Sequence, residues 1–184
     1  MVAIISCCLL VCLIIGGLSI FQSSKLLEKN ANESLAYMSN DYANEFSCVL
    51  NTIEGTLNTL EANIISRFDI SKFQADPKNY FSEYQNGLSP AFKLIGETTE
   101  GMNGIYFTSH PDLLGEIHEI WYIDEDGDGN FESMMNDETY QDKFYPENEE
   151  MDWFYKAIES DKGVWSEPYV DTDIDTYMVS YTKA

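Results

Sequence analysis

Residues 104–134 read GIYFTSHPDLLGEIHEIWYIDEDGDGNFESM, and this stretch decides the fold. Two short runs within it, 104–109 and 118–124, are rich in β-branched and aromatic residues and end at turn-forming residues, as strands do. The acidic, glycine-containing run at 124–129 predicts a turn, and 130–134 can then return as the partner strand of a hairpin. We therefore expect an antiparallel sheet in the folded part of the chain.

The chain downstream of this sheet predicts one helix and two further strands. Residues 152–160 suit a helix that begins with Asp152 as its N-cap. Residues 163–170 (GVWSEPYV) and 176–183 (TYMVSYTK) have the composition of strands, joined by the acidic loop DTDID at 171–175.

Upstream of the sheet, an apolar stripe predicts a long helix. Its members recur at spacings of three and four: Leu35, Met38, Tyr42, Phe46, Val49, Ile53, Leu57, Leu60 and Ile64. A helix of about 40 residues is about 60 Å long, so part of it must be a stalk. Packing on the chain's own sheet and a parallel dimer stalk both explain the stripe. Residues 78–97 predict a second helix, which Pro90 is expected to divide in two.

Residues 2–21 (VAIISCCLLVCLIIGGLSIF) carry no charge. A helix of that length spans about 30 Å, the thickness of a hydrocarbon core. Since no basic n-region, short apolar stretch or A-x-A-like site marks a cleaved signal peptide, we expect an uncleaved anchor. Lys25 and Lys29 after the span would place the C-terminal side in the cytoplasm. Met1 abuts the apolar run so closely, however, that this signal does not fix the orientation.

The charge balance limits the partners. The chain has 32 acidic and 10 basic residues, a formal net charge of −22. Such a field repels phosphate backbones and anionic headgroups, which argues against nucleic-acid binding and indicates that the folded part projects from the membrane. Of the four cysteines, only Cys48 lies beyond the apolar start. It is interpreted as a small apolar residue on a helix, with a disulfide between two copies of the chain as the alternative.

Nothing in the sequence predicts an enzyme. No GxSxG, P-loop or GxGxxG motif occurs. Neither His110 nor His118 has motif support for a nucleophile, a base and an orienting group, and both are interpreted as structural.

Several motifs follow one another in a characteristic order. They are Ile105-Tyr106-Phe107, Ile120-Trp121-Tyr122, Gly127-Asp128-Gly129, Trp153-Phe154-Tyr155, GVWSEPYVD at 163–171 and Ser180-Tyr181. This order resembles the extracellular double-Cache domain of clostridial-type chemoreceptors, sensor kinases and diguanylate cyclases. The resemblance covers about residues 20–184 and is most specific from Trp153 to Tyr181.

The resemblance implies an α+β fold: a transmembrane helix that continues into a long helix, then a PAS-like antiparallel sheet with flanking helices. The chain would comprise a transmembrane anchor at 1–21, a long juxtamembrane helix at 22–68 and a membrane-distal Cache subdomain at 69–184. The last strand of that subdomain, the proximal subdomain and the output module of such receptors are expected beyond residue 184.

The resemblance also implies a ligand site. In related domains a Trp at a helix start and the Tyr and Asp of PYxD line the ligand cleft, which corresponds here to Trp153, Tyr169 and Asp171. Aromatic walls can shield a small polar ligand while a carboxylate fixes a cationic group. Relatives that bind amino acids carry an Arg where this chain has Met151, so amines and other uncharged or cationic molecules fit better. The alternative is that these aromatic side chains fill the core.

Asp124, Asp126 and Asp128, with Gly129, fit the first half of a calcium loop. Met135 stands where such a loop carries its bidentate Glu, and no flanking helix pair is evident. We therefore interpret the run as a structural hairpin turn and expect no cofactor, with bound Ca²⁺ as the alternative.

Together these features predict the extracytoplasmic ligand-sensing domain of a receptor in the plasma membrane. It would bind a small molecule, transmit the binding through the long helix, and form a homodimer through the same helix. A membrane-anchored solute-binding or adhesive surface protein is the alternative. A membrane-bound hydrolase is a third, for which the sequence offers no site.

Overall fold

The computed structural model describes the backbone of residues 1–134, 140–160, 162–171 and 176–184. The description does not extend to the side chains of residues 2–11 and Tyr140. The chain forms two compact units, residues 1–48 and 49–184, and one helix, α1 (Val2–Arg67), supplies all of the first and the start of the second. The expected division at residues 21 and 68 stays a prediction.

The first unit is helical from Val2 onward. Its apolar stripe is open to solvent: Leu35, Met38, Tyr42 and Phe46 are between 54% and 67% exposed. Among the helices whose side chains are described, none combines the length and the apolar character that a membrane crossing requires. The side chains of residues 2–11, the first half of the expected span, are not among those that the structure describes.

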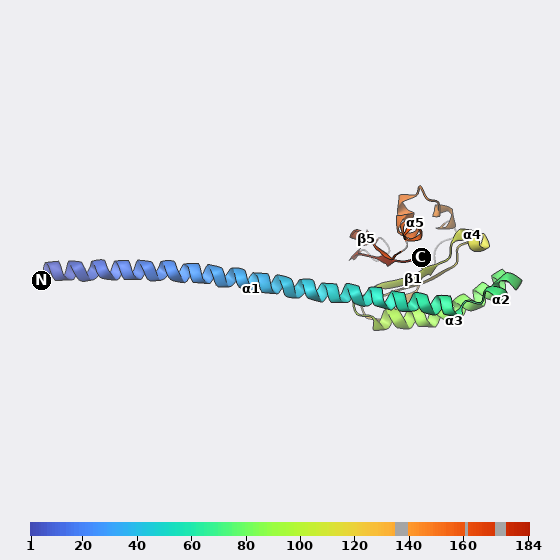
Figure 1. The fold of residues 1–184 in the computed structure, drawn as a ribbon, viewed down its shortest axis with the longest axis horizontal. Helices are drawn as coiled ribbons and strands as arrows, with labels where there is room; N and C mark the ends of the chain where they lie inside the picture. Colours follow the sequence, from blue (N-terminus) through green and yellow to red (C-terminus); the bar gives the residue numbers. More distant parts are fainter. Residues whose placement is uncertain (135–139, 161, 172–175) are drawn as a thin grey trace. The chain divides into compact units, whose positions relative to one another are not determined.

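Two further helices follow α1 in the second unit, α2 (Ile70–Ala75) and α3 (Pro77–Thr98). Aspartates begin both: the Asp69 carboxylate accepts from two amides of α2, and the Asp76 carboxylate accepts from the first turn of α3. Figure 1 shows α3 beside the last part of α1, where the Tyr84 hydroxyl donates to the Ile64 carbonyl at 2.6 Å.

Pro90 does not divide α3, contrary to the expectation from the sequence. A proline removes one helical hydrogen bond, which weakens a helix but need not end it. Here Leu88 and Phe92, on either side of Pro90, are only 2% and 1% exposed. Their burial against the core outweighs the lost bond and holds the helix continuous.

The central sheet confirms the antiparallel arrangement expected from residues 104–134. Its order is β1-β2-β3, with Tyr106 opposite Trp121 and Ile123 opposite Glu132. The bounds are β1 (Gly104–Thr108), β2 (Glu119–Ile123) and β3 (Glu132–Ser133), with the short helix α4 (Pro111–Leu114) between β1 and β2.

The core lies between this sheet and the helices α1 and α3. Its buried members are Leu60, Leu88, Phe92, Met102, Ile105, Ile120 and Phe131. Side chains alternate between the two faces of a strand. Ile105 and Phe107 therefore face the helices, where Phe107 contacts Phe81 and Phe92, and Tyr106 faces the opposite side.

The described residues from 140 onward contain two 3₁₀ turns, one helix and four short strands. The bounds are η1 (Tyr140–Lys143), η2 (Glu149–Met151), α5 (Asp152–Glu159), β4 (Val164–Trp165), β5 (Tyr169–Asp171), β6 (Thr176–Met178) and β7 (Tyr181–Thr182). β4 pairs with β7 and β5 with β6, both antiparallel. Most of the expected acidic loop, residues 172–175, lies outside the described residues.

Two details here differ from the expectation. Each of the two expected strands, 163–170 and 176–183, is divided into two short ones. Pro168 interrupts the first because it has no backbone N–H for the ladder. Asp152 is the first residue of α5 rather than its N-cap, a position that Met151 takes without a side-chain bond. The Asp152 carboxylate instead accepts from the Lys156 ammonium at 2.6 Å.

The architecture is thus α+β, with a long N-terminal helix followed by small antiparallel sheets. This confirms the coarse fold class expected from the sequence.

Candidate functional site

Aromatic side chains gather where α5 lies against the face of β1 that points away from the helical core. Trp153, near the start of α5, meets the Tyr106 ring edge-on, with ring centroids 5.0 Å apart. Phe144 and Phe154 also contact the indole, with ring centroids 6.3 and 5.7 Å from it. Trp153 therefore packs against three aromatic rings of the described residues.

Tyr106 connects this cluster to the last strand. Its hydroxyl shares a hydrogen bond with the Thr182 hydroxyl on β7. Burial raises the pKa of the Tyr106 phenol far above its ordinary value, and the electrostatic influence of Tyr169 raises it further, while the bond to Thr182 opposes the shift. Tyr106 is accordingly neutral at physiological pH and acts as a fixed hydrogen-bonding partner.

Tyr169 lies on β5 and is only partly covered, at 38% exposure. Its hydroxyl lies 2.6 Å from the Ser180 hydroxyl and donates to the Met178 sulfur at 3.1 Å. Burial raises the pKa of Tyr169, as does the negative charge of Asp171, against the bond to Ser180. Asp171 ends β5 opposite Thr176 and lies on the same face of the strand as Tyr169.

The three residues predicted to bind a ligand thus come from two elements, α5 and β5. Trp153 contacts Tyr106, and Tyr169 is near enough to influence the ionisation of Tyr106. Their role in a common cleft stays a prediction. Sequence reasoning missed Tyr106, although the alternation within Ile105-Tyr106-Phe107 could have shown that it faces away from the core.

A shallow apolar hollow of about 300 Å³ lies elsewhere, on the helical side of the sheet. Its lining consists of Ile64, Ile65, Phe68, Phe81, Tyr84, Phe107 and Leu113. None of the predicted ligand residues borders it.

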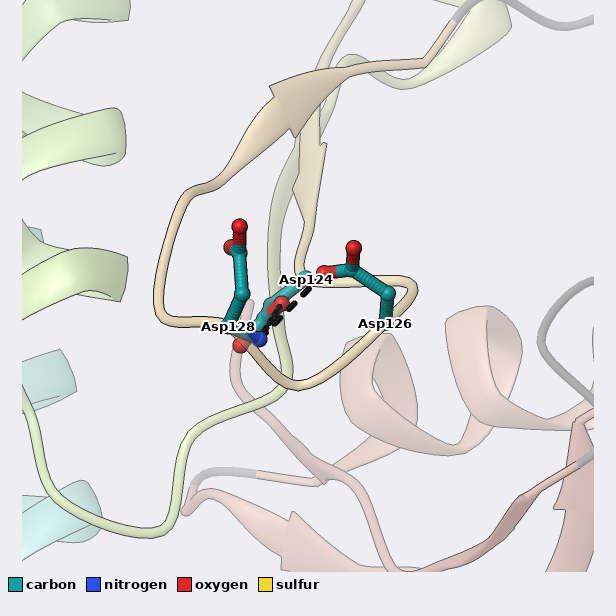
Figure 2. Close-up of side chains that lie close together, drawn as sticks. All are labelled: Asp124, Asp126 and Asp128. Carbon is teal, nitrogen blue, oxygen red and sulfur yellow. Dashed lines mark hydrogen bonds between the residues drawn. The ribbon is translucent and has the colours of Figure 1, made fainter.

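The acidic turn after β2 brings three carboxylates together (Figure 2). One oxygen from each of Asp124, Asp126 and Asp128 lies within 4.8 Å of the others. Asp124 Oδ1 accepts from the amides of Gly127 and Asp128 at 2.9 and 3.1 Å, and its Oδ2 accepts from Gly129 at 3.0 Å. Backbone amides therefore compensate much of the charge of Asp124.

The same turn could offer these oxygens to a divalent cation, since carboxylates are the ligands that Ca²⁺ prefers. The position where a calcium loop would carry its bidentate Glu, Met135, lies outside the described residues. The expectation that the turn is structural and that the protein uses no cofactor stays a prediction.

The two histidines hold local structure. His110 caps α4, where its Nδ1 accepts from the Asp112 amide at 3.2 Å. His118 meets Phe81 edge-on at 5.3 Å, and its buried Nε2 has no hydrogen-bond partner in the described structure, the Glu116 carboxylate being 3.6 Å away. A hydrogen bond from Lys78, followed by its charge, lowers the pKa of Glu116. That the protein is not an enzyme stays a prediction.

Comparison with protein families decides the class. Residues 92–184 match the family described as methyl-accepting chemotaxis protein-like, first PDC sensor domain, and the match covers half of the chain. The chain belongs to this family. Every element from β1 to β7, and with them Trp153, Tyr169 and Asp171, lies within the matched residues of the PDC sensor domain. No curated protein and no solved structure matches the chain.

Membership in this family supports the expected chemoreceptor-type sensor domain with a PAS-like α+β fold. It also supports the inference that the domain senses a small-molecule ligand. The family match does not extend to the clostridial double-Cache type.

Proposed function

We propose that the chain is the extracytoplasmic part of a transmembrane chemoreceptor of the clostridial double-Cache type, and that it binds a small amine. The contact between Trp153 and Tyr106 supports this proposal, because Tyr169 is near enough to influence the ionisation of the same Tyr106. Aromatic faces attract cations, and a carboxylate adds a charged hydrogen bond.

The charges around the site favour an amine over an amino acid. Met151, which stands where amino-acid-binding relatives carry an Arg, is 4% exposed and belongs to the apolar interior. The nearest lysine on α5, Lys156, is paired with Asp152. An α-carboxylate would therefore lack the bidentate partner that such ligands need.

The test is a thermal-shift screen of amines, amino acids and dicarboxylates on the full-length ectodomain. We expect the hits to concentrate among the amines, and Asp171→Asn to weaken binding by about 1.5–3 kcal/mol, the range for a hydrogen bond to a charged group. Asp152→Asn is the matched control, since it removes a nearby carboxylate that is already paired with a lysine. A dicarboxylate as the best ligand, or amine binding unchanged by Asp171→Asn, would show that the assigned chemistry is wrong.

We further propose that residues 2–21 anchor the chain in the plasma membrane. Their lack of charge supports this. Mass spectrometry of the membrane fraction should then detect intact N-terminal peptides, whereas a mature N-terminus near Gln22 would contradict the anchor.

The second candidate is a membrane-anchored solute-binding or adhesive surface protein without signalling output. An exposed apolar pair on the β5–β6 ribbon favours it: Val170 lies opposite Tyr177, at 41% and 82% exposure, and contiguous exposed apolar surface marks interaction sites. The gene downstream of Ala184 separates the two, because a second membrane span followed by a signalling module belongs to the receptor alone.

A further inference from the structure

Trp165 on β4 and Lys183, the residue after β7, both bind one face of α1. The Trp165 indole donates to Glu54 Oε1 at 2.6 Å. The Lys183 ammonium donates to Asn58 Oδ1 at 2.8 Å and to Glu61 Oε2 at 2.6 Å. Glu54, Asn58 and Glu61 are four and three residues apart, so they lie in a row along one face of the helix.

Trp165 belongs to a two-stranded ribbon, the pair β4–β7, and Lys183 directly follows the last residue of β7. Trp165 is directly opposite Tyr181, with ring centroids 5.1 Å apart. The Tyr181 ring also covers Gly163 so closely that a Cβ on that glycine would lie 2.1 Å from it. Pairing and packing therefore hold the ribbon together, and it contacts α1 through Trp165 on β4 and through Lys183 directly after β7.

The other face of the ribbon contacts the candidate ligand site. Because side chains alternate along a strand, Thr182 points away from the side that carries Tyr181 and Lys183. Its hydroxyl bonds to Tyr106, the neighbour of Trp153. Thr182 thus contacts the candidate ligand site, and the next residue, Lys183, contacts α1.

The ion pair between Lys183 and Glu61 is partly buried. Side-chain exposures of 25% for Lys183 and 33% for Glu61 make it the least exposed lysine–carboxylate pair in the described part of the chain. Solvent screens such a pair less than a surface pair, so its geometry constrains its partners more strongly.

We propose that Thr182 and Lys183 couple the aromatic site to α1. The proposal rests on the ligand site proposed above. A ligand that enters beside Trp153 displaces or reorients Tyr106, the bond to Thr182 transfers that change to the ribbon, and Lys183 transfers it to α1 at Asn58 and Glu61. Lys183 acts here as a positioning residue and does not touch the ligand.

A purely structural role for these contacts would hold the ribbon on the helix without linking it to Tyr106. A double-mutant cycle separates the two, because only coupled residues give non-additive effects. The variants are Tyr106→Phe, which removes one hydroxyl, Lys183→Met, which removes the ion pair, and their combination. Hydrogen–deuterium exchange on the detergent-solubilised chain then reports the opening of α1 at residues 54–64.

We expect Tyr106→Phe to accelerate exchange in this segment about fivefold, the effect of one lost hydrogen bond. In the Lys183→Met background the same substitution should add less than twofold. Lys183→Arg, which keeps the charge, should restore the larger effect, and Glu61→Gln should remove it as Lys183→Met does. Tyr155→Phe and Lys156→Met on α5 are the controls for the loss of a hydroxyl and of an ammonium.

Equal acceleration by Tyr106→Phe in both backgrounds, or none in α1, overturns the coupling. If Lys183→Met prevents folding, the comparison between Lys183→Arg and Glu61→Gln decides in its place. The cycle needs no ligand, so it fails independently of the proposed function. Amine binding without coupling overturns this inference alone, and coupling without any amine ligand overturns the proposed ligand instead.

Discussion

The Phe131 ring lies in the space that a side chain on Gly96 would fill. A Cβ on this glycine of α3 would be 2.5 Å from Phe131 Cδ1, and Phe131 itself is 1% exposed. Phe131 thus anchors the loop between β2 and β3 in the core. Its ring fits there because position 96 of α3 carries no side chain.

Gly96→Ala should therefore destabilise the protein by about 1–3 kcal/mol, the range for overpacking a filled core. Gly87→Ala is the matched control on the same helix, because nothing lies within 4 Å of its added Cβ. There, alanine should stabilise by up to about 1 kcal/mol through helix propensity. Urea unfolding of the two variants provides the measurement, and equal effects would contradict the packing described for Phe131.

The buried phenol of Tyr106 predicts a loss of stability in alkaline solution. Its pKa is raised in the folded state relative to about 10 in the unfolded chain, so its contribution to stability is complete below about pH 10 and declines above it. Tyr106→Phe should lower stability at neutral pH, through the lost bond to Thr182, but should make the decline between about pH 8 and pH 11 shallower.

Denaturant midpoints at both pH values test this, with Tyr177→Phe as the control because Tyr177 is 82% exposed. The same alkaline decline in Tyr106→Phe as in the unmodified chain would show that Tyr106 is not the group responsible.

The acidic turn should hold its shape without metal. The amides of Gly127, Asp128 and Gly129 already bind both oxygens of Asp124, so melting curves in EDTA and in millimolar Ca²⁺ should nearly coincide. Occupancy at 100 times the dissociation constant would add about 2.7 kcal/mol to the free energy of unfolding. A shift of that size that Asp126→Ala abolishes would identify the turn as a calcium site.

The exposed stripe of the first unit should join two copies of the chain. Tyr42 and Met38 are 67% and 54% exposed at the spacing of a helix–helix seam. Tyr42→Glu should raise the dissociation constant of the homodimer about tenfold or more, since a charge would be buried without a partner. Asn40→Glu, on the opposite side of the helix, should leave it unchanged in sedimentation of the detergent-solubilised chain. Monomers at every concentration would contradict the stalk.

The sequence signals that depend on neighbouring residues predicted the secondary structure correctly where those residues alone decide it. The strands at 104–109 and 118–124 and the helix at 78–97 could be predicted from the sequence, because strand composition, turn chemistry and helical periodicity depend on a few adjacent residues. The same signals were wrong at Pro90, where burial of the surrounding apolar residues overrode the helix-breaking tendency of proline.

The sequence by itself determined the long helix, the antiparallel sheet and, through its motifs, the sensor family. Only the tertiary structure decided that Tyr106 joins Trp153 to Thr182 and that the ribbon carrying Thr182 binds α1 through Trp165 and Lys183. Tyr106 and Thr182 are 76 residues apart, and Glu54 and Trp165 are 111 apart. No periodicity or turn motif encodes such pairs, because they form when separately folded segments pack against each other and their polar groups must find partners away from water.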